Sequence, residues 1–197
     1  MSVLDHAAPA ASADALRATA RAIRWIGFDV DGVLTDAGVY MGQLDGQRVE
    51  LKRFDIRDGF GIKLLQFAGL DVALVSARVS QATAVRAAEL GIIDVVQDDA
   101  GNKQRAIASL LSAKGLDWPQ AAFMGDDLPD LAVFQHVALA IAPADAVPDI
   151  GARAHLRLAA GGGRGAVREC AEWLLRARGQ YDEVVARYVG ERGGHWP

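Results

Sequence analysis

The chain has 197 residues, 51% of them apolar and 23% charged, which is sufficient for one globular domain and excludes a disordered chain. Its net charge of −4, without an obvious basic face, argues against nucleic-acid binding. The single cysteine, Cys170, excludes an internal disulfide framework. The sequence has neither a secretory signal nor a window of membrane-spanning length, so we predict a cytoplasmic protein.

The two ends of the chain differ in composition from the middle. Residues 1–20 are rich in alanine and are expected to form a flexible leader, in which 14–21 can form a short helix. Residues 179–197 are polar and rich in glycine, and are expected to form a mobile tail. We therefore predict a single folded domain over residues 21–178, because no internal repeat or second boundary is found.

An apolar run at residues 23–28 stops abruptly at Asp29 and Asp31, which are followed by Gly32. Such a run indicates a strand buried on both faces, and ligands of parallel sheets gather at the carboxyl ends of the strands. Alternation along a strand would place both carboxylates on one side of the backbone, where Mg²⁺ would relieve their repulsion. The alternative is a simple turn, in which Asp and Gly serve only their turn conformations.

Two strand-like segments, 38–41 and 48–54, flank a loop that ends in Asp45-Gly46, which predicts a small β-hairpin flap over about residues 38–54. Helical and strand patterns then alternate along the chain. Further strands are expected at 71–76, 94–97, 121–124, 137–141 and 156–158, and helices at 60–68, 80–90, 103–114, beyond 130, and at 166–178. This order predicts an α/β fold, with a doubly wound, Rossmann-like parallel sheet and helices on both faces.

Polar side chains follow four of the predicted strands, and each has a role available in phosphoryl transfer. Asp29 can attack phosphorus as a nucleophile and form an aspartyl-phosphate, while Asp31 can protonate the leaving oxygen and later activate water. Ser76 can donate a hydrogen bond to a phosphate oxygen, and Lys103 can neutralise phosphoryl charge. Asp126 would complete a carboxylate site for Mg²⁺.

Simpler roles exist for several of these residues. Ser76 can cap a turn, and Lys103 can be a solvated lysine at a helix start. A cation is unfavourable there against the helix dipole, which favours an anionic partner for Lys103. Asp127 and Asp130 can cap the helix that follows, and Asp130 can also link to Lys103 without binding the metal itself.

Together these residues resemble the haloacid dehalogenase superfamily of phosphohydrolases. The matching motifs are residues 29–36, Ser76, Lys103 and 125–127, in the order of the superfamily. The resemblance covers about residues 23–178. It implies that Asp29 is the nucleophile, that Asp31 is the acid and base, and that Mg²⁺ binds Asp29, Asp126 and the backbone carbonyl of Asp31.

Four further motifs lie at residues 40–42, 50–52, 57–62 and 162–169. With them, the chain resembles one family within the superfamily, the 3-deoxy-D-manno-octulosonate 8-phosphate phosphatases, which act in the synthesis of bacterial lipopolysaccharide. This resemblance implies a capless homotetramer, in which the hairpin and the C-terminal tail cover a neighbour's site. The two gaps between motifs are indeed too short for a cap domain. The resemblance implies the following substrate-binding residues: Asp31, Asp55, Ile56, Arg57, Asp58, Gly59, Lys63, Arg78, Arg86 and Lys103.

Two departures leave the exact sugar acid open. Ser76-Ala77-Arg78 stands where the family usually has Thr-Gly-Arg, and Lys63 stands where arginine is common. A nonulosonate 9-phosphate phosphatase, which shares the capless tetrameric plan, is the first alternative. A phosphomutase is disfavoured, since it needs a cap. A phosphoaspartate signalling module is disfavoured because it does not need Asp31, and an inert scaffold because every motif residue is retained.

Overall fold

The computed structural model describes residues 12–197, and the beginning of the predicted leader, residues 1–11, lies outside this range. Within it, Ala13–Ala22 form helix α1, which corresponds to the short helix expected there. The side chain of Ser12 caps this helix by accepting a hydrogen bond from the backbone N–H of Ala15, at 3.2 Å. The leader is therefore helical over most of its described length.

The centre of the fold is a six-stranded sheet in the order β5-β4-β1-β6-β7-β8, in which all neighbouring strands are parallel. The strands are β1 (Trp25–Phe28), β4 (Asp71–Ser76), β5 (Asp94–Gln97), β6 (Ala121–Met124), β7 (Leu139–Ala142) and β8 (Leu156–Arg157). This order confirms the predicted parallel α/β sheet, and it places β1 between β4 and β6 at the centre.

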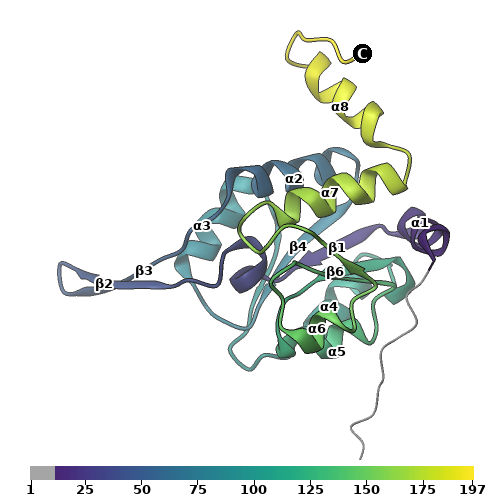
Figure 1. The fold of residues 1–197 in the computed structure, drawn as a ribbon. Helices are drawn as coiled ribbons and strands as arrows, with labels where there is room; N and C mark the ends of the chain where they lie inside the picture. The colour runs from purple at the N-terminus through teal and green to yellow at the C-terminus, as the bar shows by residue number, and fades with distance from the viewer. Residues whose placement is uncertain (1–11) are drawn as a thin grey trace, which may run out of the picture.

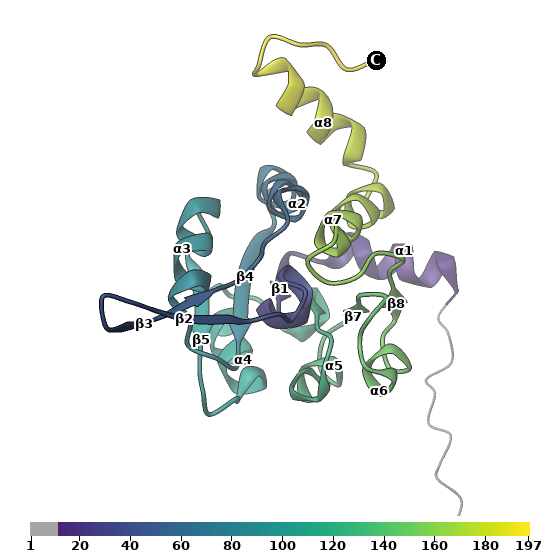
Figure 2. The same ribbon diagram turned by 60° about the vertical axis from the view of Figure 1, so that its left-hand side comes forward.

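Helices cover both faces of the sheet, as predicted (Figure 2). One face carries α1, α2 (Ile56–Phe67), α3 (Gln81–Leu90) and α7 (Ala166–Ala177); the other carries α4 (Lys103–Ala113), α5 (Leu131–Phe134) and α6 (Pro148–Gly151). Strand β1 shows how the sequence divides the core: Ile26 and Phe28 pack on the first side, and Trp25 packs on the second. Burying each such side chain contributes roughly 1.5–3 kcal/mol to folding.

Helix α2 begins at Ile56, four residues earlier than predicted, because Asp55 caps it by accepting a hydrogen bond from the N–H of Arg57 at 2.8 Å. Gly61 lies inside this helix and does not end it. A Cβ at Gly61 would lie 2.9 Å from the Cα of Arg168 in α7. Glycine therefore serves close packing between α2 and α7 rather than a break in the helix.

Within the predicted C-terminal tail, Tyr181–Gly190 form helix α8, an element that the sequence analysis did not predict (Figure 1). Its apolar residues recur at helical spacing, and Tyr181 and Val184 are buried. Tyr188 packs edge-on against Phe60 of α2, with ring centroids 4.9 Å apart. Across residues 12–197, no helix has the length and apolar character needed to cross a membrane.

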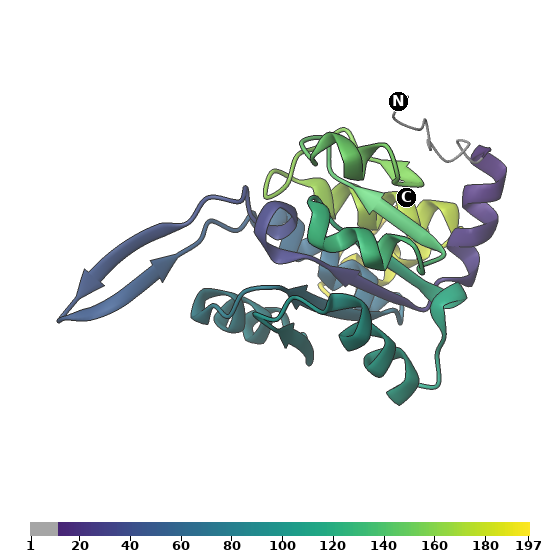
Figure 3. The same ribbon diagram turned by 90° about the horizontal axis from the view of Figure 1, so that it is seen from below.

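The predicted hairpin is present and extends away from the body of the molecule (Figure 3). Its strands β2 (Tyr40–Leu44) and β3 (Gln47–Leu51) pair antiparallel, and they continue up to a two-residue turn at Asp45 and Gly46, both with positive φ. The turn is therefore shorter than the predicted loop. Between residues 36 and 76 the chain forms only the hairpin, α2 and β4, so this segment holds no cap domain.

Candidate active site

The site is built around the point where β1 ends. Asp29 is still extended, but Val30–Leu34 form one wide π-type turn, closed by a hydrogen bond from the N–H of Thr35 to the carbonyl of Val30 at 3.0 Å, in which Gly32 has a φ of +96°. The strand alternation predicted through Asp31 therefore fails after Asp29. A Cβ at Gly32 would overlap the carboxylate of Asp126, so glycine is needed to bring the turn against that side chain.

The register of the sheet brings the other predicted residues to the same edge. Phe28 pairs with Leu74 of β4 and with Met124 of β6, so Ser76 and Asp126, each two residues further on, lie on either side of the end of β1. The N–H of Asp29 donates to the carbonyl of Met124 at 2.9 Å. Ser76 is buried, and its Oγ accepts a hydrogen bond from the N–H of Arg78 at 3.1 Å.

Lys103 is the cation at the centre of the site. Its side chain is 4% exposed, and its Nζ lies 2.8 Å from Asp29 Oδ1 and 2.7 Å from Asp130 Oδ1. Burial alone would lower the pKa of Lys103, but the charges of Asp130 and Asp29 outweigh it and raise that pKa. The anionic partner expected for Lys103 is thus present, and so is the contact with Asp130.

Three carboxylates, those of Asp29, Asp126 and Asp130, have oxygens within 4.8 Å of one another. Burial, followed by the charge of Asp130, raises the pKa of Asp29 to about 6, although Lys103 acts in the opposite direction. Burial, followed by the charge of Asp29, raises the pKa of Asp126 to about 8. The site therefore holds more negative charge than Lys103 balances, and a cation would stabilise it.

Two of these carboxylates are free to bind such a cation. Both oxygens of Asp130 are used, one by Lys103 and the other by the backbone N–H groups of Asp126 and Asp127, at 3.0 and 3.3 Å. Asp126 Oδ1, in contrast, is buried without a hydrogen-bond partner among residues 12–197. Asp29 and Asp126 fit Mg²⁺, which prefers one or two carboxylates with water and phosphate oxygens.

Asp31 has a partner to which the sequence analysis assigned no role. Lys52, just after β3, donates to Asp31 Oδ2 at 2.9 Å and lies 2.7 Å from Oδ1. Lys52 belongs to the motif at residues 50–52, but nothing in that motif indicates that the base of the hairpin contacts the turn after β1. Asp127 caps the following turn by accepting from the N–H of Leu128 at 2.7 Å, which was the simpler role considered for it.

The predicted substrate-binding residues at the start of α2 have divergent surroundings. Ile56 is exposed, and the guanidinium of Arg57 is exposed beside the carboxylate of Asp55, 2.8 Å away. Asp58 is fully buried, and its oxygens accept hydrogen bonds from the N–H groups of Gly165 and Arg168, at 3.1 and 2.9 Å. Asp58 thus anchors the start of α7, which argues against a side-chain contact with substrate.

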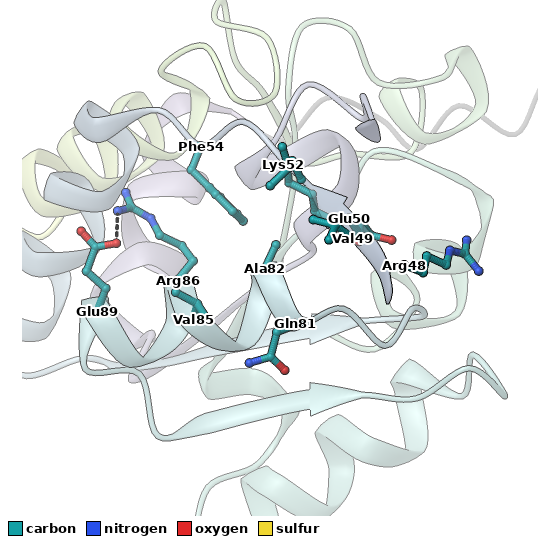
Figure 4. Close-up of a pocket in the computed structure, with 11 residues that line it drawn as sticks. Arg48, Val49, Glu50, Lys52, Phe54, Gln81, Ala82, Val85, Arg86 and Glu89 are labelled. Atoms are coloured by element: carbon teal, nitrogen blue, oxygen red, sulfur yellow. Dashed lines mark hydrogen bonds and ion pairs between the residues drawn. The ribbon is translucent and has the colours of Figure 1, made fainter. Parts of the chain in front are cut away.

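Gly59 and Arg86 pack against each other, since a Cβ at Gly59 would overlap the guanidinium of Arg86. Arg86 also donates to Glu89 at 2.8 Å and to the carbonyl of Asp55 at 3.3 Å. It lines a pocket of about 590 Å³ between the base of the hairpin and α3, together with Lys52 and Phe54 (Figure 4). Arg86 is therefore placed at a cavity that is also lined by Lys52, the partner of Asp31.

The last two predicted cations lie in different places. Arg78 is half-exposed near the carboxyl edge of the sheet, where its Nη2 lies 3.1 Å from Glu50 Oε2. Lys63 donates instead to the carbonyl of Leu90, at the end of α3. Within this chain, the structure does not bring Lys63 to the carboxylate cluster, because α2 directs it toward the end of α3.

No family model matches the chain, but individual proteins do. The chain is 41% identical over 178 residues to the 3-deoxy-D-manno-octulosonate 8-phosphate phosphatase KdsC of Escherichia coli K12, covering 90% of this chain and 92% of the relative. The structure of the phosphatase of that name from Yersinia pestis is similar, with a TM-score of 0.81, 39% identity and coverage of 85% and 89%. The Moraxella catarrhalis enzyme, in complex with magnesium, phosphate and KDO, gives a TM-score of 0.84, 30% identity and coverage of 89% and 99%.

Proposed function

The chain belongs to the haloacid dehalogenase superfamily, among its 3-deoxy-D-manno-octulosonate 8-phosphate phosphatases, and on this basis we propose that it hydrolyses that sugar-acid phosphate with Mg²⁺. One observation supports the reaction most directly. Asp29 stands at the end of the central strand, 2.8 Å from the buried ammonium of Lys103 and beside Asp126, whose Oδ1 has no hydrogen-bond partner in the described part of the chain. The product would be a lipopolysaccharide precursor, as the family resemblance implies.

The proposed reaction has two steps. In the first, a carboxylate oxygen of Asp29 attacks phosphorus, the bond to the sugar oxygen breaks, and Asp31 donates its proton to that oxygen. The enzyme then holds an aspartyl-phosphate. In the second step, water attacks the phosphorus while Asp31 accepts a proton, which releases inorganic phosphate and restores Asp29.

The other site residues would stabilise the negative charge of the phosphoryl group. Lys103 and the hydroxyl of Ser76 would contact the phosphoryl oxygens, and Asp130 would hold Lys103 in place. Asp29, Asp126 and the carbonyl of Asp31 would hold Mg²⁺, which neutralises charge on the phosphoryl group. Arg78, half-exposed near this edge, and Arg57, exposed at the start of α2, are suited to the carboxylate of the sugar acid.

We expect the purified protein to prefer sugar-acid phosphates to phosphates of sugars without a carboxylate. The reason is that Arg57 and Arg78 have no carboxylate to bind on a simple sugar. The test compares kcat/KM for 3-deoxy-D-manno-octulosonate 8-phosphate, a nonulosonate 9-phosphate and glucose 6-phosphate. A tenfold or greater preference, about 1.4 kcal/mol, is expected for the octulosonate. Equal values for all three would contradict the proposed substrate class, and a preference for the nonulosonate would identify the alternative function.

We also propose that the protein acts as a homotetramer in which the hairpin, and the tail with α8, cover a neighbour's site. Support comes from the hairpin itself, on which Tyr40, Met41, Leu44 and Leu51 are exposed. Apolar side chains concentrated on a projecting element are typical of an interface. A cytoplasmic location, the domain bounds at 21–178 and mobility of the tail at 179–197 stay predictions.

The double substitution Tyr40→Ser and Leu44→Ser should reduce the mass measured by light scattering and weaken the preference for the sugar-acid phosphate. The site chemistry should persist, because neither residue contacts the carboxylate cluster. Ile93→Ser is the matched control, since Ile93 is 94% exposed but lies away from the hairpin, between α3 and β5. A wild-type protein that is monomeric and fully selective would contradict the assembly proposal.

A further inference from the structure

A continuous series of polar contacts connects Asp31 to the loop between β4 and α3. It runs from Asp31 to Lys52, then to Glu50, and from Glu50 to both Arg78 and Ser80. These residues come from three separate parts of the chain: the turn after β1, the base of the hairpin and the loop before α3. Lys52 and Glu50 lie side by side at the base of the hairpin (Figure 4).

The first contact fixes the carboxylate of Asp31. The side chain of Lys52 has no exposed surface, and its ammonium donates a hydrogen bond to Asp31 Oδ2 at 2.9 Å. The ammonium also lies 2.7 Å from Oδ1, which has no hydrogen-bond partner among residues 12–197. An ammonium buried without an anion is costly, so the pair is expected to persist. The hydrogen bond to Oδ2 restricts rotation of the carboxylate about its last bond and therefore orients Asp31, while Oδ1 accepts no hydrogen bond from the described residues and can carry the proton.

Lys52 is in turn held by Glu50, whose Oε1 lies 3.6 Å from the ammonium. The hydroxyl of Ser80 donates to the same oxygen at 2.7 Å, and Arg78 lies 3.1 Å from the other oxygen. The hydrogen bond from Ser80 is the main cause that lowers the pKa of Glu50, with Lys52 and Arg78 adding to it. Glu50 is thus an ionised anchor joined to the body of the protein.

We propose that Lys52, held by Glu50, is a positioning residue that orients Asp31 toward the leaving oxygen. The proposal rests on the function given above, in which Asp31 protonates that oxygen. Lys52 need not contact the substrate in this role. The base of the hairpin thereby becomes part of the acid–base apparatus, and the displacement of Lys52 would impair proton donation before it impaired phosphate binding.

The test separates proton donation from the rest of the reaction by changing the leaving group. A sugar alcohol must be protonated as it leaves, whereas the p-nitrophenolate of p-nitrophenyl phosphate leaves without a proton. Release of each leaving group is measured in a single turnover with enzyme in excess, so that later hydrolysis of the phosphoenzyme does not contribute. The variants are Lys52→Met, Glu50→Gln and Asp31→Asn.

Lys52→Met should slow release from the sugar phosphate at least about tenfold more than release from p-nitrophenyl phosphate, because general acids contribute about 10²- to 10⁴-fold. Glu50→Gln keeps an acceptor for Ser80 but removes the charge facing Lys52, so it should show the same discrimination to a smaller extent. Lys114→Met is the matched control: it also removes a lysine ion pair, with Asp71 and Asp94, but at the starts of β4 and β5. It should not discriminate.

The outcomes distinguish a failure of the proposed acid role of Asp31 from a failure of the positioning role of Lys52. If Asp31→Asn shows no dependence on the leaving group, its acid role fails, and with it the basis for Lys52. If Asp31→Asn discriminates but Lys52→Met slows both substrates equally or neither, only the positioning role is overturned. Should Lys52→Met fail to fold by circular dichroism, Glu50→Gln decides: a lack of discrimination in that variant contradicts the proposal.

Discussion

Replacing Asp29 with asparagine should abolish phosphate release while leaving the fold intact. The introduced side chain would retain an oxygen that accepts a hydrogen bond from Lys103, but its amide is not a nucleophile, so no aspartyl-phosphate can form. We expect kcat to fall roughly 10⁴-fold or more, the scale seen when a covalent nucleophile is removed. The free energy of unfolding should change by no more than about 1 kcal/mol, since size and one hydrogen bond are kept.

Phosphate release with 3-deoxy-D-manno-octulosonate 8-phosphate gives the readout, and chemical denaturation gives the stability. Asp149→Asn is the control, because Asp149 is an exposed carboxylate on α6 that pairs with Arg153. It should be fully active. Peptide mass spectrometry must show that the asparagine introduced in place of Asp29 is intact, because deamidation restores aspartate. Turnover well above any such reverted fraction would show that Asp29 is not the nucleophile.

Lys103→Met should lower both the stability and the activity of the protein, because one buried ammonium pairs with both Asp29 and Asp130. Methionine has a similar length, but it leaves two buried carboxylates without a cation. Breaking a buried ion pair in this way costs about 3–5 kcal/mol of stability. Loss of a positive group beside the transferring phosphoryl should also lower kcat about 10²- to 10³-fold.

The stability should be measured in EDTA, because a bound divalent cation would offset part of the lost charge. Lys114→Met is again the control. Lys114 pairs with Asp71 and Asp94, but this pair is partly exposed to solvent, and such pairs contribute less than about 1 kcal/mol. An equal loss of stability in both variants would contradict the central role assigned to the Lys103 pairs.

The sequence was most informative where local pattern and sheet geometry coincide. The strands 71–76, 94–97 and 121–124 were predicted with the bounds that the structure shows, because short apolar runs bounded by turn residues have few alternatives. Parallel strands place their carboxyl ends at one edge, so the positions of Asp29, Ser76 and Asp126 along the chain were enough to group them. Helix α8 was missed although its apolar spacing was visible, because the composition of the tail was given more weight.

Local sequence by itself thus determined the parallel α/β sheet, the hairpin and the edge at which the chemistry would lie. Only the tertiary structure decided which charges meet there. It placed Lys52 on Asp31, used Asp58 to anchor α7, and turned Lys63 toward the end of α3. The reason is physical: strand and helix periods depend on near neighbours, whereas these contacts join segments that approach only after the hairpin and helices pack on the sheet.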